Sequence, residues 1–173
     1  MAPRSDRGFT LIELLIVVAI ISIIAAFAIP GLLRTRMTGN ETSAVVSMKA
    51  IGVAEVAYST GCGGGGFAPS LPVLYAPPGG AGQGYIDASL GLSATPMKAG
   101  YNFVLTNGAG AGAGPTDCNG TASTTTFYAT GIPVTFGTSG TRSFATNQEN
   151  TVWQITGPAA PTEPFGAPAQ PVQ

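Results

Sequence analysis

The sequence predicts an α+β fold in which one long N-terminal helix packs on a small antiparallel β-sheet. Three observations support this prediction. A single apolar run occupies 9–33, where Thr10, Glu13 and Ser22 are the only polar side chains. A helical pattern of apolar residues resumes at 41–58. Beyond it, four short strand-like runs are separated by Gly, Asn and Pro, which is typical of an antiparallel sheet.

Composition restricts the functions that the chain can have. Charged residues make up 9% of the 173 residues, against about 25% in ordinary soluble domains. The formal charge is -1, so there is no basic surface of the kind that binds nucleic acid. Histidine, the commonest general base and metal ligand, is absent. No motif supports a Ser–Lys pair built on Lys49 or Lys98, and we expect no catalytic residue, no cofactor, no metal site and no enzymatic activity.

The apolar run at 9–33 is predicted to span a membrane. From Phe9 to Ile29 it forms about 30 Å of helix, which matches the hydrocarbon core of a bilayer. A helix buried in the core of a soluble domain is the alternative. It is disfavoured because little of the remaining chain is available to cover an all-apolar helix.

An eight-residue stretch, 1–8, precedes the apolar run and carries two arginines. An ordinary secretory signal is cleaved after its apolar region, whereas the candidate cleavage point here, Gly8–Phe9, comes before it. The string Gly-Phe-Thr-Leu-Ile-Glu-Leu-Leu-Ile-Val, which starts at Gly8, resembles the cleavage and methylation motif of type IV pilins and type II secretion pseudopilins.

This resemblance implies that a prepilin peptidase and methyltransferase cleaves after Gly8 and methylates the new terminal amine of Phe9. It implies that Glu13 is the acidic residue at the fifth mature position, and that Pro30 stands where many pilins place a helix-breaking proline. It also implies a single-pass precursor in the inner membrane, with its C-terminal bulk outside the cytoplasm. An inner-membrane assembly platform would then build a filament at the cell surface or in the periplasm. Arginines flank the span on both sides, so the orientation follows from the resemblance and not from charge.

Glu13 is predicted to be an assembly residue, because a carboxylate inside a membrane helix is costly without a partner. Cleavage after Gly8 creates a cationic amine at Phe9, four residues away. The amine of a neighbouring subunit would neutralise Glu13 and fix the axial register of the incoming subunit. The alternative is that Glu13 lies at the lipid headgroups and extends its side chain to water.

Pro30 and Gly31 are predicted to interrupt or kink the helix, because proline lacks a backbone donor and clashes with the preceding turn. In the helical pattern at 41–58, apolar residues line two opposite faces. One face carries Ala44, Met48, Ile51 and Tyr58, and the other carries Val46, Ala50, Val53 and Ala57. We expect the first face to pack on the head of the same chain and the second to pack on sister subunits, with a helix buried in a monomer as the alternative.

Three further positions of this helix carry expectations. Asn40 is a candidate N-cap for the second helical half, and Gly61 is expected to end it. Glu55 falls on the face that is expected to pack against the head. We expect it at the rim of that face.

The chain is expected to have five parts: a leader at 1–8, a transmembrane and polymerisation helix at 9–33, a second helical half at 34–61, a small β-rich head at 62–157, and a Pro/Ala-rich tail at 158–173. The strand-like runs lie at 101–106, 124–130, 142–146 and 151–156, and the last two resemble the final strands of many pilin-like proteins. The tail has too little apolar bulk to fold alone.

Cys62 and Cys118 lie in predicted loops of the head. In an exported protein such a pair forms a disulfide. The bond would close a loop of more than 50 residues, worth about 4 kcal/mol in the chain-entropy model. Two free thiols are the alternative.

The sequence therefore predicts a structural subunit of a type IV pilus-like filament, extracellular or periplasmic. Its expected partners are sister pilin subunits, the prepilin peptidase and methyltransferase, the inner-membrane assembly platform and membrane lipid. A pseudopilin of a type II secretion system is the alternative. Major pseudopilins carry clustered acidic residues near the C-terminus, where this chain has only Glu149 and Glu163. A membrane-anchored binding module is less favoured, since it would need neither Gly8 before the apolar run nor Glu13.

Overall fold

The computed structural model describes residues 8–172, and it divides into two compact units, Met1–Arg36 and Met37–Gln173. One helix, α1 (Leu11–Gly61), begins in the first unit and ends in the second. Each unit is considered by itself. Of the predicted leader, only Gly8 belongs to the described residues, and 1–7 lie outside them.

The described part of the first unit is helical from Leu11 onward and leaves its apolar side chains exposed. Ile20 is 53% exposed and Phe27 is 82% exposed. Among the described residues, α1 is the one helix long and apolar enough to cross a membrane. The first unit therefore has no core of its own, and its apolar surface needs lipid or other protein around it.

The helix continues through Pro30 and Gly31, where the sequence predicted an interruption. That prediction of an interruption is wrong. A proline removes one backbone donor, and the strong helix formers on both sides supply enough remaining bonds to continue the helix. A kink at this position stays a prediction. Asn40 lies inside α1 and does not cap it; its Nδ2 donates to the carbonyl of Ser139 at 3.0 Å. Gly61 ends the helix, as predicted.

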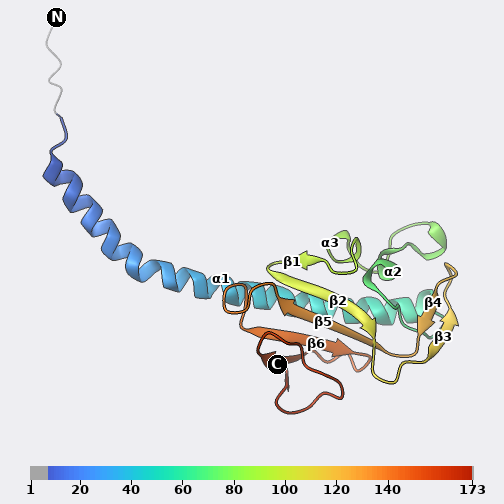
Figure 1. Ribbon diagram of the computed structural model, residues 1–173. Coiled ribbons are helices and arrows are strands. Elements are labelled where there is room, and N and C mark those ends of the chain that lie inside the picture. Colours follow the sequence, from blue (N-terminus) through green and yellow to red (C-terminus); the bar gives the residue numbers. More distant parts are fainter. Residues whose placement is uncertain (1–7, 173) are drawn as a thin grey trace, which may run out of the picture. The chain divides into compact units, whose positions relative to one another are not determined.

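The second unit pairs α1 with an antiparallel sheet, which confirms the predicted α+β fold (Figure 1). The sheet has the strand order β1-β2-β5-β6-β7-β8 and is antiparallel throughout. Its strands are β1 (Met97–Lys98), β2 (Tyr101–Asn107), β5 (Phe127–Pro133), β6 (Arg142–Asn147), β7 (Trp153–Thr156) and β8 (Gln170–Pro171). A separate hairpin is made by β3 (Ala113–Thr116) and β4 (Ala122–Thr124). Short helices α2 (Leu71–Tyr75), η1 (Pro78–Gly80) and α3 (Ala88–Gly91) connect α1 to the sheet.

The strand predicted at 124–130 lies three residues further along, as β5. Thr124 belongs to β4, which pairs with β3, and it also bonds to Phe67. At the other end, β5 continues through Gly131, a residue type that sequence reasoning takes as a break. A Cβ on Gly131 would lie 3.1 Å from the Phe103 ring and 3.2 Å from the sulfur of Met48. Gly131 is therefore used where α1 approaches the sheet closely.

The core forms where one face of the sheet meets α1. Alternate residues of β2 point inward, so that Tyr101, Phe103 and Leu105 are buried against Met48 and Ile51 of the helix. An ion pair holds the same layers together at their edge. The guanidinium of Arg142 in β6 lies 2.7 Å from the carboxylate of Glu41 in α1.

The Pro/Ala-rich tail packs on the face of the sheet that points away from α1. Tyr128 and Trp153 lie on this face because they alternate along their strands with residues that point into the core. The ring of Phe165 stacks on Trp153 with centroids 5.5 Å apart, and the Tyr128 hydroxyl donates to the carbonyl of Pro161. Two residues of the tail form β8 on the edge of β7. The tail thus obtains from the sheet the backbone partners and apolar contacts that it lacks by itself.

Candidate functional site

The predicted processing junction lies just ahead of the long helix. Gly8, Phe9 and Thr10 are non-helical and exposed, and the Phe9 side chain is 81% exposed. Nothing lies within 4 Å of the position where a Cβ on Gly8 would stand. The peptide bond between Gly8 and Phe9 therefore lies outside the helix, and it is accessible to a protein that approaches it.

Glu13 sits in the first turn of α1 and is bonded within its own chain. Its Oε2 accepts from the backbone N–H of Thr10 at 2.9 Å and from the Thr10 hydroxyl at 2.6 Å. The Thr10 hydroxyl oxygen in turn accepts from the Glu13 N–H at 3.3 Å. This reciprocal arrangement is a capping box, and a negative charge here also faces the positive end of the helix dipole.

Sequence reasoning missed this second role, although the spacing Thr-x-x-Glu before an apolar run indicates it. The hydrogen bonds satisfy part of the carboxylate's capacity but supply no positive charge. Glu13 is also the only carboxylate between residues 8 and 36. The hydroxyl of Ser22, by comparison, is satisfied locally by the carbonyl of Val18 at 2.7 Å.

The part of α1 in the second unit presents two different apolar faces, as the sequence predicted. Ala44, Met48, Ile51 and Tyr58 are buried in the head, none more than 1% exposed. On the other face, Val46 is 62% and Val53 is 65% exposed. The first face is thus confirmed as the one that packs on the head, and the second is left uncovered by the residues that the structure describes.

Cys62 and Cys118 form the predicted disulfide, with Cα atoms 5.0 Å apart. The bond ties the end of α1 to the β3–β4 loop. The backbone supports it, since the N–H of Cys118 donates to the carbonyl of Cys62 at 3.0 Å. Beside it, the Tyr58 hydroxyl donates to the carboxylate of Asp117 at 2.8 Å. Helix end and loop are therefore joined by one covalent and several polar contacts.

Comparison with known proteins agrees with the motif at the N-terminus. The family described as "Prokaryotic N-terminal methylation motif" matches residues 3–29. The chain is 46% identical over 56 residues to the type IV major pilin protein PilA of Myxococcus xanthus. It is 62% identical over 39 residues to the type IV wide pilus major component PilA4 of Thermus thermophilus. The N-terminal part of the chain is therefore similar to that of type IV pilins.

The relation to these pilins covers a limited part of each molecule. The matched segments are 32% and 22% of this chain and span 25% and 30% of the length of the two relatives. No solved structure shows significant similarity to the chain. The head must therefore be understood from its own geometry.

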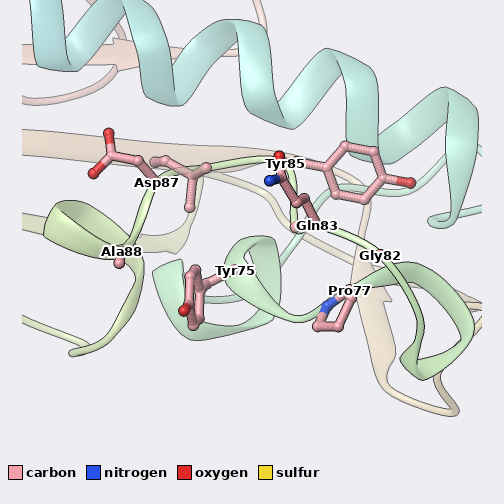
Figure 2. Close-up of a pocket in the computed structure, with 9 residues that line it drawn as sticks. Tyr75, Pro77, Gly82, Gln83, Tyr85, Asp87 and Ala88 are labelled. Atoms are coloured by element: carbon pink, nitrogen blue, oxygen red, sulfur yellow. The ribbon is translucent and has the colours of Figure 1, made fainter.

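A groove of about 510 Å³ lies on the head, between the segment that follows α2 and the residues before α3 (Figure 2). Tyr75, Pro77 and the stretch 82–88 line it. Its one carboxylate, Asp87, accepts from the N–H of Ser89 and lies 3.8 Å from the ammonium of Lys98. The groove thus offers no pairing of nucleophile and base. Among the described residues, 8–172, no three His, Cys, Asp or Glu side chains gather as a metal site would need.

Glu55 is the residue that sequence reasoning placed wrongly. It was expected at the rim of the packed face of α1, but its side chain is 0% exposed. Burial raises the pKa of its carboxyl to about 8, and a hydrogen bond from the backbone of Ala68 opposes this only in part. The helical spacing puts Glu55 on the face that packs on the head, and the full burial of its side chain agrees with that spacing.

Proposed function

We propose that this chain is a structural subunit of a type IV pilus-like filament, processed at its N-terminus and assembled through α1. One observation carries the proposal. A methylation motif of the pilin family stands directly before an exposed apolar helix that contains a single carboxylate, Glu13. Neither a soluble domain nor a simple membrane anchor needs that combination.

Processing is the first part of the proposal. A prepilin peptidase and methyltransferase cuts between Gly8 and Phe9 and methylates the amine of Phe9. The exposed, non-helical backbone at this junction supports it, since a peptidase must bind its substrate in extended form. The precursor then lies in the inner membrane with the head outside the cytoplasm, where a disulfide between Cys62 and Cys118 is stable.

Assembly is the second part. The capping box orients the Glu13 carboxylate toward the N-terminal end of α1, where the new amine of Phe9 is created. Hydrogen bonds from Thr10 do not neutralise its charge, so in a low-dielectric surrounding the ionised carboxylate still favours a cation nearby. The amine of a neighbouring subunit supplies that cation, and the pairing sets how far each subunit advances into the filament.

Sister subunits also cover the outer face of α1 in the second unit. Val46 and Val53 expose apolar surface next to Lys49, which is exposed as well. A helix face of this kind gains free energy when another apolar helix packs on it. The inner-membrane assembly platform adds subunits in this arrangement, and membrane lipid surrounds the apolar segment before that step.

The proposal is tested by isolating filaments from the surface of cells that express the chain and by mass spectrometry of their subunit. We expect a chain that begins at Phe9 and is heavier by one methyl group. Gly8→Ala should still be processed, whereas Gly8→Leu should retain residues 1–8, because a bulky side chain blocks the peptidase pocket. Filaments built from chains that begin at Met1 would contradict the proposal. Secretion of a cargo protein that depends on the chain, without surface filaments, would support the pseudopilin alternative.

A further inference from the structure

The carboxyl group of Glu55 lies in the core of the head with one of its two oxygens unpartnered. Its Oε2 accepts from the backbone N–H of Ala68 at 2.8 Å. Its Oε1 is buried and has no hydrogen-bond partner. One helical turn to either side, Ile51 and Tyr58 are buried as well. An ionised carboxylate in this place would keep an unsatisfied negative charge in an apolar surrounding.

No positive charge faces Glu55 from the elements packed around it. Of the cations in the head, Arg142 pairs with Glu41 and Lys98 pairs with Asp87. The segment 67–74, which contains the donor Ala68, has no charged residue, and neither do β2 and β5.

The titratable groups near Glu55 do not favour its ionised form either. Tyr58 lies on the same helix, and its hydroxyl donates to the carboxylate of Asp117. Its ring contacts that of Tyr85, with centroids 5.8 Å apart. Burial is the main cause that raises the pKa of Tyr58, and the nearby carboxylates of Asp117 and Glu55 raise it further. The neighbouring Tyr58 is a neutral phenol and its partner Asp117 is a carboxylate, so neither supplies a positive charge and protonation is the favourable state of Glu55.

We propose that Glu55 is a protonated carboxylic acid that holds the segment after the disulfide against α1, as a latch, and that loss of the proton weakens this contact. The Glu55 latch consists of the Glu55 carboxyl and the backbone of Ala68. The segment that it holds starts at the disulfide-bonded Cys62 and leads into α2, beside the groove. The disulfide keeps one end fixed, so ionisation acts on the chain between Cys62 and α2. The proposal is independent of the filament function.

The pH range of the latch follows from linkage. The unfolded carboxyl releases its proton near the ordinary pKa of 4.5, whereas the folded one keeps it up to about 8. Between these values the folded head holds one proton more than the unfolded chain, so its stability falls as the pH rises. The folding equilibrium constant should drop by up to roughly tenfold for each pH unit in this window and level off above it.

The test uses the full chain in nonionic detergent, unfolded with urea between pH 4.5 and 9. The single tryptophan, Trp153 in β7, reports on the head by fluorescence. Glu55→Gln keeps the shape and the bond to Ala68 without a titrating group, and should flatten the decline between pH 4.5 and 8. The matched control Glu149→Gln, at an exposed carboxylate outside the core, should keep the wild-type decline.

Infrared spectroscopy of the wild-type protein provides a second measurement that needs no variant. The carbonyl band of a protonated carboxylic acid should be present at pH 6.5, where ordinary Asp and Glu are ionised, and should disappear above about pH 8. Absence of this band at pH 6.5 would overturn the proposal and indicate an ionised Glu55 bonded to a buried water molecule. An equal decline in wild-type and Glu55→Gln proteins would overturn it as well.

Discussion

The two units of this chain obtain stability in opposite ways. In the described part of the first unit the large apolar side chains of α1 are exposed, with one carboxylate and no core. In the second unit the same helix buries one face against the sheet, and a disulfide and a partly buried ion pair stabilise the head further. One continuous helix thus serves two purposes. The apolar side chains of its first part need lipid or other protein around them, whereas its second part packs into a head with a core of its own.

A mutation in α1 should therefore affect either assembly or folding, according to the unit and the helix face on which the mutated residue lies. The apolar character of a residue does not decide between these two effects, because α1 is rich in apolar residues in both units. The deciding quantity is whether a side chain is covered within its own chain.

The largest effect is expected for Glu13→Val. If the carboxylate pairs with the Phe9 amine of a neighbour, removing it should abolish filaments, with a loss of tenfold or more in filament number by electron microscopy. Cleavage after Gly8 acts on the isolated precursor and should be normal, and the head should unfold at the same urea concentration as in the wild type.

Glu13→Gln and Glu13→Asp sharpen the result. Glu13→Gln keeps an acceptor for the Thr10 bonds but no charge, so a filament defect in it assigns the role to charge and not to the capping box. Glu13→Asp should be intermediate, because it keeps the charge on a shorter side chain. Wild-type filament number in Glu13→Val would show that the carboxylate is no assembly determinant.

The next largest effect concerns the head alone. Cys62→Ser should lower the free energy of unfolding by about 4 kcal/mol, because the bond closes a loop with a sequence separation of 56 residues. Urea unfolding followed by Trp153 fluorescence measures it. The double variant with Cys118→Ser should lose no more than the single one, since the bond is already gone. A larger loss in the double variant would mean that the side chains act through packing and not through the bond.

A pair of substitutions on opposite faces of α1 tests the comparison most directly. Met48 is fully buried and Val53 is 65% exposed, five residues apart on the same helix. Met48→Ala should lower the free energy of unfolding by about 2–5 kcal/mol through the cavity it leaves. Val53→Ala should change it by less than about 0.5 kcal/mol.

Filament yield should show the reverse order. Val53→Asp places a charge on the exposed face and should reduce assembly without changing urea unfolding of the head. If Val53→Asp assembles normally, sister subunits do not cover this face. A destabilised head in Val53→Asp would instead show that the exposed face takes part in folding.

How much could be predicted from the sequence differs between the two units, for a physical reason. In the first unit each signal is local: the motif beginning at Gly8, the length of the apolar run, and the isolated Glu13 are read from consecutive residues. Even the missed capping box is a four-residue pattern, Thr10 to Glu13. The pairing of Glu13 with a neighbouring subunit stays a prediction, because it depends on a second chain.

In the head the sequence determined the α+β class, the inward face of α1, the strands near 101–106 and 142–146, and the cysteine pair. Periodicity and turn residues carry that information, because burial repeats every 3.6 residues in a helix and every two in a strand. Only the tertiary structure decided that β5 runs through Gly131, that the tail packs on the sheet and that Glu55 is buried. These three features depend on contacts between residues far apart in the chain, such as Met48 over Gly131, and no local pattern specifies which distant residue will lie opposite.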